Sequence, residues 1–75
     1  MSRIVSDPGV LGGKPVIEGT RISVEFVLEL LASGMSETEI LEDYPHLTPE
    51  GLRAGLAYAA QAFHNEVYLE LDAAS

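Results

Sequence analysis

The chain of 75 residues has no cysteine, no tryptophan, only four lysine or arginine residues and no long hydrophobic run. The lack of cysteine excludes disulfides and thiolate metal ligands. A membrane-spanning helix needs about 18 or more consecutive apolar residues, and the N-terminus lacks the apolar core of a signal peptide. We therefore expect a cytoplasmic protein that does not insert into a membrane.

The small size of the chain allows one domain, residues 1–75, with a thin hydrophobic core. Domains of this size bury only roughly 60% of the surface that their unfolded chain exposes. Yet 47% of the residues are hydrophobic and only 21% are charged, which is more apolar surface than one small core requires. We therefore expect a homodimer or a complex with another protein.

The net charge of −8 is distributed unevenly along the chain. Residues 1–21 hold three cations and two acids, whereas residues 22–75 hold one cation, Arg53, and ten acids, a balance of −9. Nucleic acids attract cations that release counterions from phosphate, so most of this chain would repel them. A basic protein partner matches the charge distribution better.

Two helix starts lie about a dozen residues apart in the middle of the chain. Ser36 and Glu39 have the spacing of a capping box, which predicts a helix over 37–43. Thr48 is followed by a proline at the first helical position, which predicts a helix over 49–64. A second proline between the two helices requires a turn, so the outline is that of a helix-turn-helix.

An earlier helix, residues 24–33, is apolar around most of its circumference. Ser23 is suited to cap its start and Gly34 to end it with a positive φ. Phe26 and Leu30 widen the apolar stripe beyond what one core-facing side needs. We predict that these two residues contribute to a partner or subunit interface.

Two glycines, Gly51 and Gly55, lower the helix propensity of the last helix. We predict that another part of the chain approaches the helix closely at these positions. Residues at core-facing spacing in the same helix are Leu52, Leu56, Ala59 and Phe63.

Residues 3–22 are expected to form an edge strand followed by a β-hairpin. The halves of the hairpin flank a Glu-Gly pair, which predicts a two-residue turn with positive φ at the glycine. Ile17 would then pair with Thr20, and Val16 with Arg21. Arg21 would lie off the core face, where it either meets a partner or closes on a carboxylate of its own chain.

The pattern changes from helical to alternating after the last helix. Val67, Leu69 and Leu71 interleave with polar residues, which predicts a strand over 66–71, and a continued helix is the alternative. A strand there would join the hairpin of its own chain or of a second subunit. Tyr68 is therefore a further partner-binding candidate. The predicted fold is mainly α, a three-helix domain with an N-terminal hairpin and a C-terminal strand.

No catalytic or metal-binding set is evident in the sequence. The two histidines, His46 and His64, lack the spacing of metal ligands to any neighbouring residue. We therefore expect no enzyme, no catalytic residues, no metal and no cofactor. For DNA binding, Arg53 near the start of the last helix is suited to read guanine, and Gln61 and His64 lie further along.

Several sequence blocks resemble those of a prokaryotic family, domain of unknown function 433. The blocks occur in order within about residues 3–64: Gly12-Gly13-Lys14-Pro15-Val16-Ile17, Gly19-Thr20-Arg21, Tyr44-Pro45-His46-Leu47-Thr48 and Leu56-Ala57-Tyr58-Ala59-Ala60. The resemblance implies a small helix-turn-helix or winged-helix-like domain, often encoded beside a PIN-like nuclease. It also implies a VapB-type antitoxin, and it supplies no catalytic residues.

Three functional hypotheses follow. The first is an antitoxin-like, dimeric binding module that neutralises a basic nuclease toxin and contributes to transcriptional autoregulation, binding DNA together with that partner. The second is a stand-alone helix-turn-helix regulator that binds DNA by itself. The third is a dimeric structural module.

Overall fold

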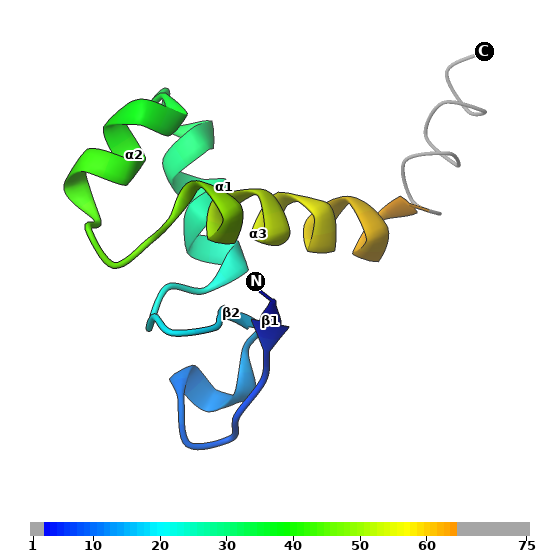
Figure 1. Ribbon diagram of the computed structural model, residues 1–75. Coiled ribbons are helices and arrows are strands. Elements are labelled where there is room, and N and C mark those ends of the chain that lie inside the picture. The colour runs from blue at the N-terminus through cyan, green and yellow to red at the C-terminus, as the bar shows by residue number, and fades with distance from the viewer. Residues whose placement is uncertain (1–2, 65–75) are drawn as a thin grey trace, which may run out of the picture.

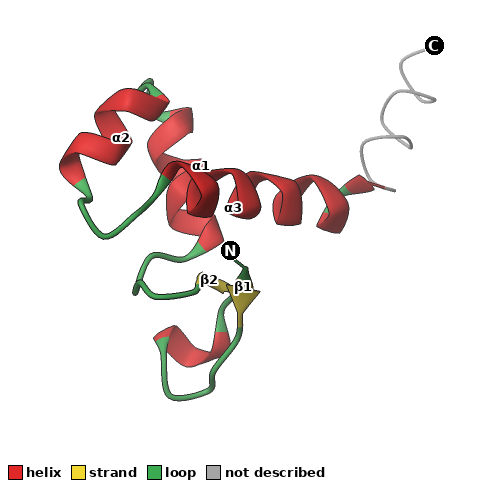
Figure 2. Ribbon diagram, in the orientation of Figure 1, coloured by secondary structure: helices red, strands yellow, loops and turns green. Residues whose placement is uncertain are grey.

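The computed structural model describes residues 3–64 and is mainly helical (Figures 1 and 2). Three α-helices accompany a two-stranded antiparallel sheet in this part of the chain. In chain order the elements are β1 (Ile4–Val5), the 3-10 helix η1 (Leu11–Gly13), β2 (Val16–Ile17), α1 (Val24–Ala32), α2 (Glu37–Asp43) and α3 (Pro49–Ala62). The predicted strand over 66–71, with Tyr68, lies outside the described residues.

The helices begin at the residues that the capping signals indicated. The hydroxyl groups of Ser23, Ser36 and Thr48 each accept a hydrogen bond from the backbone N–H three residues further on. The Glu39 carboxylate in turn accepts from the Ser36 N–H at 2.9 Å, which completes the capping box. These local bonds satisfy amide groups that the first turn of a helix leaves unpaired.

The sheet is formed by β1 and β2, with residues 6–15 between them. Ile4 is opposite Ile17 and Val5 is opposite Val16. The predicted turn after β2 is present, because the Thr20 N–H donates to the Ile17 carbonyl at 3.0 Å, but the predicted register of the hairpin is wrong. Val16 forms a bridge with Ser23 rather than with Arg21.

The pairing between β2 and the start of α1 is shifted by two residues from the predicted register, and a threonine side chain bridges the residues between. The Ile17 N–H donates to the Ile22 carbonyl at 3.0 Å, so four residues separate this pair. The Thr20 hydroxyl donates to the Ile17 carbonyl and accepts from the Ile22 N–H, at 2.7 and 3.0 Å. Gly19 has the expected positive φ, at 83°. Side-chain bonds of this kind offer the backbone an alternative to a tight ladder.

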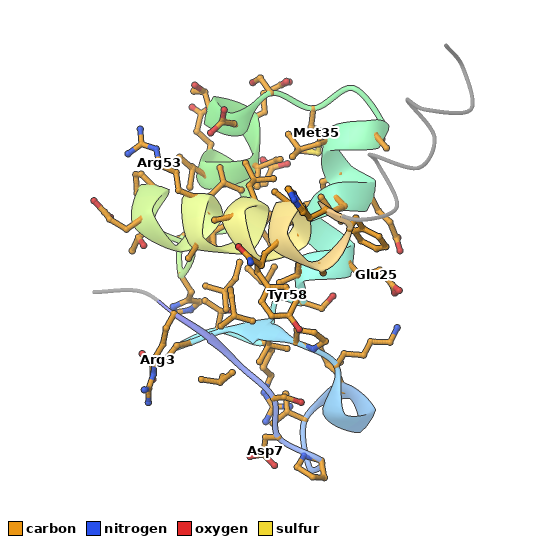
Figure 3. All side chains as sticks on the ribbon, turned by 90° about the vertical axis from the view of Figure 1, so that its right-hand side faces the viewer. Arg3, Asp7, Glu25, Met35, Arg53 and Tyr58 are labelled. Atoms are coloured by element: carbon orange, nitrogen blue, oxygen red, sulfur yellow. The ribbon has the colours of Figure 1, made fainter. Side chains whose placement is uncertain are left out.

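The hydrophobic core lies where α3 crosses α1 and covers the strands (Figures 1 and 3). None of the helices within residues 3–64 combines the length and the apolar character that a membrane crossing requires. The central buried cluster takes residues from all of the larger elements: Ile17, Val27, Ile40, Leu47 and Leu52.

Helix α3 approaches β2 closely at Gly51, as the sequence predicted, but at Gly55 an added Cβ atom would make only an ordinary contact. A Cβ atom at Gly51 would lie 3.0 Å from Cγ2 of Ile17, and one at Gly55 would lie 3.4 Å from Cδ1 of the same residue. The first distance is shorter than most Cβ contacts in proteins, so Ile17 would have to shift slightly, and the second is an ordinary contact. The absence of a Cβ atom at Gly51 therefore leaves room for the Ile17 side chain.

Phe63 does not join the core, which corrects the expectation from its spacing. Its side chain is 49% exposed. Phe63 follows the last residue of α3 and borders a hollow between that helix and α1, so the core-facing spacing continues to a position that the described elements leave open.

Candidate functional site

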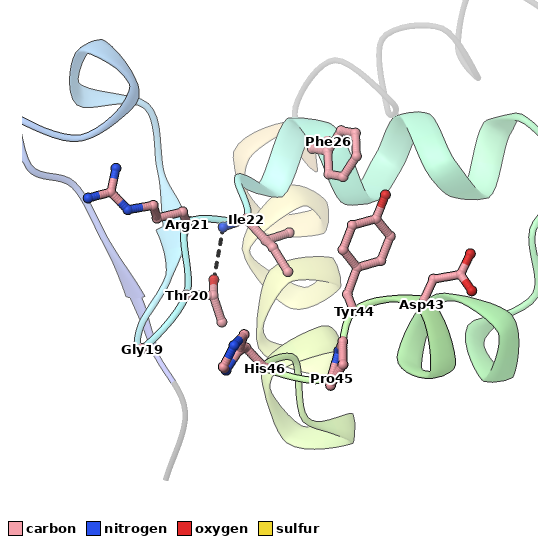
Figure 4. Close-up of a pocket in the computed structure, with 9 residues that line it drawn as sticks. All are labelled: Gly19, Thr20, Arg21, Ile22, Phe26, Asp43, Tyr44, Pro45 and His46. Atoms are coloured by element: carbon pink, nitrogen blue, oxygen red, sulfur yellow. Dashed lines mark hydrogen bonds between the residues drawn. The ribbon is translucent and has the colours of Figure 1, made fainter.

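A groove of about 620 Å³ lies between the β2–α1 loop, the start of α1 and the turn that joins α2 to α3 (Figure 4). Most of its lining is apolar. The lining residues are Gly19, Thr20, Arg21, Ile22, Phe26, Asp43, Tyr44, Pro45 and His46. The groove is large enough for one or two side chains of a partner.

An aromatic pair, Phe26 and Tyr44, forms part of the groove. The ring centroids are 5.6 Å apart and the rings are nearly perpendicular, at 87°. This edge-to-face geometry is favourable for aromatic rings. Tyr44 packs against the core, whereas Phe26 is 36% exposed. The pair therefore couples an open aromatic surface to the rigid interior.

The turn that carries Tyr44 is fixed by buried residues on both sides. The Tyr44 N–H donates to the Ile40 carbonyl, and the Leu47 N–H donates to the Tyr44 carbonyl. Ile40 and Leu47 are both buried. Pro45 follows, and its missing N–H prevents the helix from continuing. The aromatic ring is thus held by the same bonds that end α2.

The groove carries opposite charges on its two sides. Figure 4 shows Arg21 on one side of the aromatic pair and Asp43 on the other. The ion pairs within residues 3–64 are Arg3–Glu18 and Lys14–Glu25, so neither groove charge is neutralised by the described chain.

Asp43 belongs to a strongly acidic helix. Four of the seven residues of α2 are acids, and the helix contains no cation. The hydrogen bond from the Ser36 N–H lowers the pKa of Glu39 below its ordinary value of 4.5, so this carboxylate is charged at neutral pH. Glu42 and Asp43 occupy the C-terminal end, where the helix dipole disfavours negative charge. A cation at this end would be stabilised by both acids and by the dipole.

A second, smaller hollow of about 350 Å³ lies between α1 and the C-terminal half of α3. Tyr58 and Phe63 border it and are 42% and 49% exposed. The Lys14 ammonium donates to the Glu25 carboxylate at 2.8 Å at its edge. That bond raises the pKa of Lys14. Within residues 3–64, His, Asp and Glu side chains form no group of three that would hold a metal ion.

Comparison with known proteins identifies the family. Residues 4–59 match the model of the family described as protein of unknown function (DUF433). The chain belongs to the DUF433 family. An uncharacterised protein of Sinorhizobium fredii, y4eO, is 41% identical over 56 residues, which cover 75% of this chain but 25% of the relative. The chain thus spans about a quarter of that relative's length.

The fold is shared with a solved DUF433 structure. A crystal structure of a DUF433 member from Anabaena variabilis aligns with a TM-score of 0.73 at 33% sequence identity. The alignment covers 92% of this chain and 67% of that chain.

Two of the sequence blocks that suggested DUF433 meet at the groove. Residues 19–21 lie on one side and residues 44–46 on the other. Neither block is a binding motif by itself, so the sequence gives no reason to place them together.

The partner-binding candidates predicted from the sequence do not all lie at the groove. Arg21 and Phe26 line the groove. Leu30 is half-buried against the core and is not among the groove residues, and Tyr68 lies outside the described residues.

The DNA-binding candidates lie elsewhere. Arg53 and Gln61 are exposed on α3, and His64 is exposed just beyond its end. Arg53 projects outward from the helix (Figure 3). The groove and these three residues are therefore separate surfaces.

Proposed function

We propose that this DUF433 domain is an antitoxin-like binding module that neutralises a PIN-like nuclease and contributes, together with that nuclease, to transcriptional autoregulation. The supporting observation is the groove: an exposed aromatic pair beside a helix that has four acids and no cation. A nuclease must bind phosphate, and it does so with a basic surface. An acidic module with an apolar groove is complementary to such a surface.

The charge of the described residues supports a basic partner. Residues 3–64 contain nine acids and four cations, and two of the cations form the internal ion pairs. The remaining field is negative and would accelerate association with a basic protein, especially at low ionic strength.

The test is co-expression with a PIN-like nuclease encoded by an adjacent gene. We expect the two proteins to co-purify and the nuclease to lose RNase activity in the complex. An association rate that falls with added salt would support the electrostatic argument. A nuclease that neither binds nor loses activity would refute the proposed function.

Stand-alone DNA binding is the second candidate, supported by the helix-turn-helix outline of α2 and α3. The exposed face of α3 includes Arg53 and Gln61, but Glu50 at the first turn would face phosphate repulsion. A gel shift on the protein's own promoter separates the two functions. A DNA reader of the helix-turn-helix or winged-helix type should lose affinity with Arg53→Glu and with added salt.

A homodimer is a further part of the proposal. The exposed Tyr58 and Phe63 at the second hollow form apolar surface that another subunit would cover. Light scattering of the purified chain measures the mass directly. A monomer at all concentrations up to the millimolar range would refute a stable homodimer.

A further inference from the structure

We infer that the groove binds an arginine side chain of the partner, with its guanidinium beside Asp43 and its planar surface against the aromatic pair. This inference rests on the proposed function, because the nuclease is the protein that would supply the arginine. It goes further by naming the surface and the side chain that carry recognition.

The aromatic pair provides a suitable surface for a guanidinium group. In the perpendicular arrangement of Phe26 and Tyr44 the edge of one ring meets the face of the other, and Phe26 keeps 36% of its surface exposed. Guanidinium is planar and weakly hydrated, and it stacks on aromatic rings more readily than the ammonium of lysine does. The half-buried Ile22 extends the apolar surface for the methylene groups of the same side chain.

The electrostatics of the groove place the charged end of this arginine. Asp43 lies at the C-terminal end of α2, where the last turn contains no basic residue. The helix dipole and the neighbouring Glu42 add to the negative potential there. Arg21, on the other side of the aromatic pair, repels a second cation. The complementary position for a guanidinium group is therefore the Asp43 side.

The first test uses a peptide probe that is independent of any nuclease. The ¹⁵N-labelled protein is titrated with acetyl-Leu-Arg-Leu-amide, with the citrulline analogue as a neutral control of the same shape, and with the lysine analogue. We expect the arginine peptide to shift the amide signals of Phe26, Asp43 and Tyr44. The citrulline peptide should bind about tenfold more weakly, which corresponds to about 1.4 kcal/mol, and the lysine peptide should lie between them.

Other outcomes of the titration would overturn the inference. Equal binding of the arginine and citrulline peptides would show that charge is not recognised. Shifts spread over the N-terminal end of α2 instead of the groove would show general attraction to an acidic surface. A preference for an acetyl-Leu-Glu-Leu-amide peptide would show that the groove binds an acidic side chain through Arg21.

Matched variants of the whole protein test the same point. Asp43→Asn and Glu37→Gln each remove one negative charge from α2, but only Asp43 lines the groove. We expect Asp43→Asn to abolish the preference for arginine over citrulline, and Glu37→Gln to preserve it. Phe26→Leu keeps an apolar side chain but removes an aromatic face, so it should narrow the difference between the arginine and lysine peptides. Thermal unfolding confirms that each variant is folded.

The nuclease complex then separates the two proposals. If the wild-type protein does not bind the nuclease, the proposed function fails, and the peptide titration still decides whether the groove recognises arginine. If Asp43→Asn and Glu37→Gln inhibit the nuclease equally and the peptides show no preference, the groove inference fails while the proposed function stands.

Discussion

Replacing either glycine of α3 by alanine adds the same methyl group to the same helix, yet the structure indicates opposite effects on stability. In a helix interior, as at Gly55, alanine is favoured over glycine by about 1 kcal/mol, and this value is an upper bound for Gly51 in the first turn of α3. At Gly51 the new Cβ would lie 3.0 Å from Cγ2 of Ile17, whereas at Gly55 the nearest atom would be at 3.4 Å. The difference between these two distances determines the sign.

The expected magnitude follows from how firmly Ile17 is held. Its side chain is 1% exposed and belongs to the central core cluster, so it has little space to move away. Overpacking of a core costs about 1–3 kcal/mol, which equals or exceeds the helix-propensity gain of about 1 kcal/mol. Gly51→Ala should therefore destabilise by about 0–2 kcal/mol, whereas Gly55→Ala should stabilise by about 0.5–1 kcal/mol.

The assay is equilibrium unfolding in urea, with both variants measured against the wild-type protein. Gly55→Ala should unfold at a higher midpoint than Gly51→Ala, with a free-energy difference of about 0.5–3 kcal/mol between the variants. In thermal unfolding, each kcal/mol corresponds to about 4–8 °C in a domain of this size. A Gly51→Ala variant as stable as Gly55→Ala would refute the argument that close approach of Ile17 requires glycine there.

Further predictions concern the other local signals. Ser36→Ala removes the hydroxyl of the capping box and should destabilise the fold by about 0.5–2 kcal/mol in urea unfolding; no change would mean that α2 is held by packing alone. Gly34 has a φ of +102°, so Gly34→Ala should cost about 1–2 kcal/mol, and an unchanged midpoint would contradict this. The folded pKa of Glu39 is lowered from 4.5. The ionised carboxylate therefore contributes to the free energy of unfolding above pH 4.5, and this contribution is lost as the pH falls through the folded pKa. Glu39→Gln should therefore flatten the fall in melting temperature below pH 4.5, and a parallel pH profile would refute this assignment.

The helices could be predicted from the sequence because their start signals are local. Ser36 and Glu39 are three residues apart, and the bonds between them depend only on one turn of backbone. Gly51 shows the limit of this reasoning. It stands where a second capping box would have glutamate, and only the packing on Ile17 explains why a glycine is there.

The loop after β2 could not be predicted in the same way. The Glu-Gly pair forms the turn that it favours, but the Thr20 hydroxyl also bonds to the backbone on both sides, and Val16 pairs with Ser23 instead of Arg21. The main partner of β2 is β1, across ten intervening residues. A pairing over that distance is selected by the tertiary fold and not by the turn residues.

Only part of the groove could be predicted from the sequence. The sequence identified Phe26 as surplus apolar surface, but it gave no signal that Tyr44 and Asp43 would lie beside it. Their proximity depends on the packing of α1 against the turn between α2 and α3. This packing brings together residues that are at least 17 positions apart in the sequence. The contact between Phe26 and the residues of this turn therefore cannot be read from their neighbours in the sequence.

Two features of the groove are unfavourable in the free chain, and the same partner chemistry would relieve both. Phe26 leaves aromatic surface in water, and Asp43 places a negative charge at the end of a helix whose dipole disfavours it. A sequence selected only for stability would replace both, for example with a polar residue on α1 and a lysine at the end of α2. Violations of local rules concentrate where a protein binds. Phe26 and Asp43 both border one groove. A guanidinium group bound there would cover the aromatic surface and neutralise the charge at the same time, so the two features together favour an arginine ligand more strongly than either does alone.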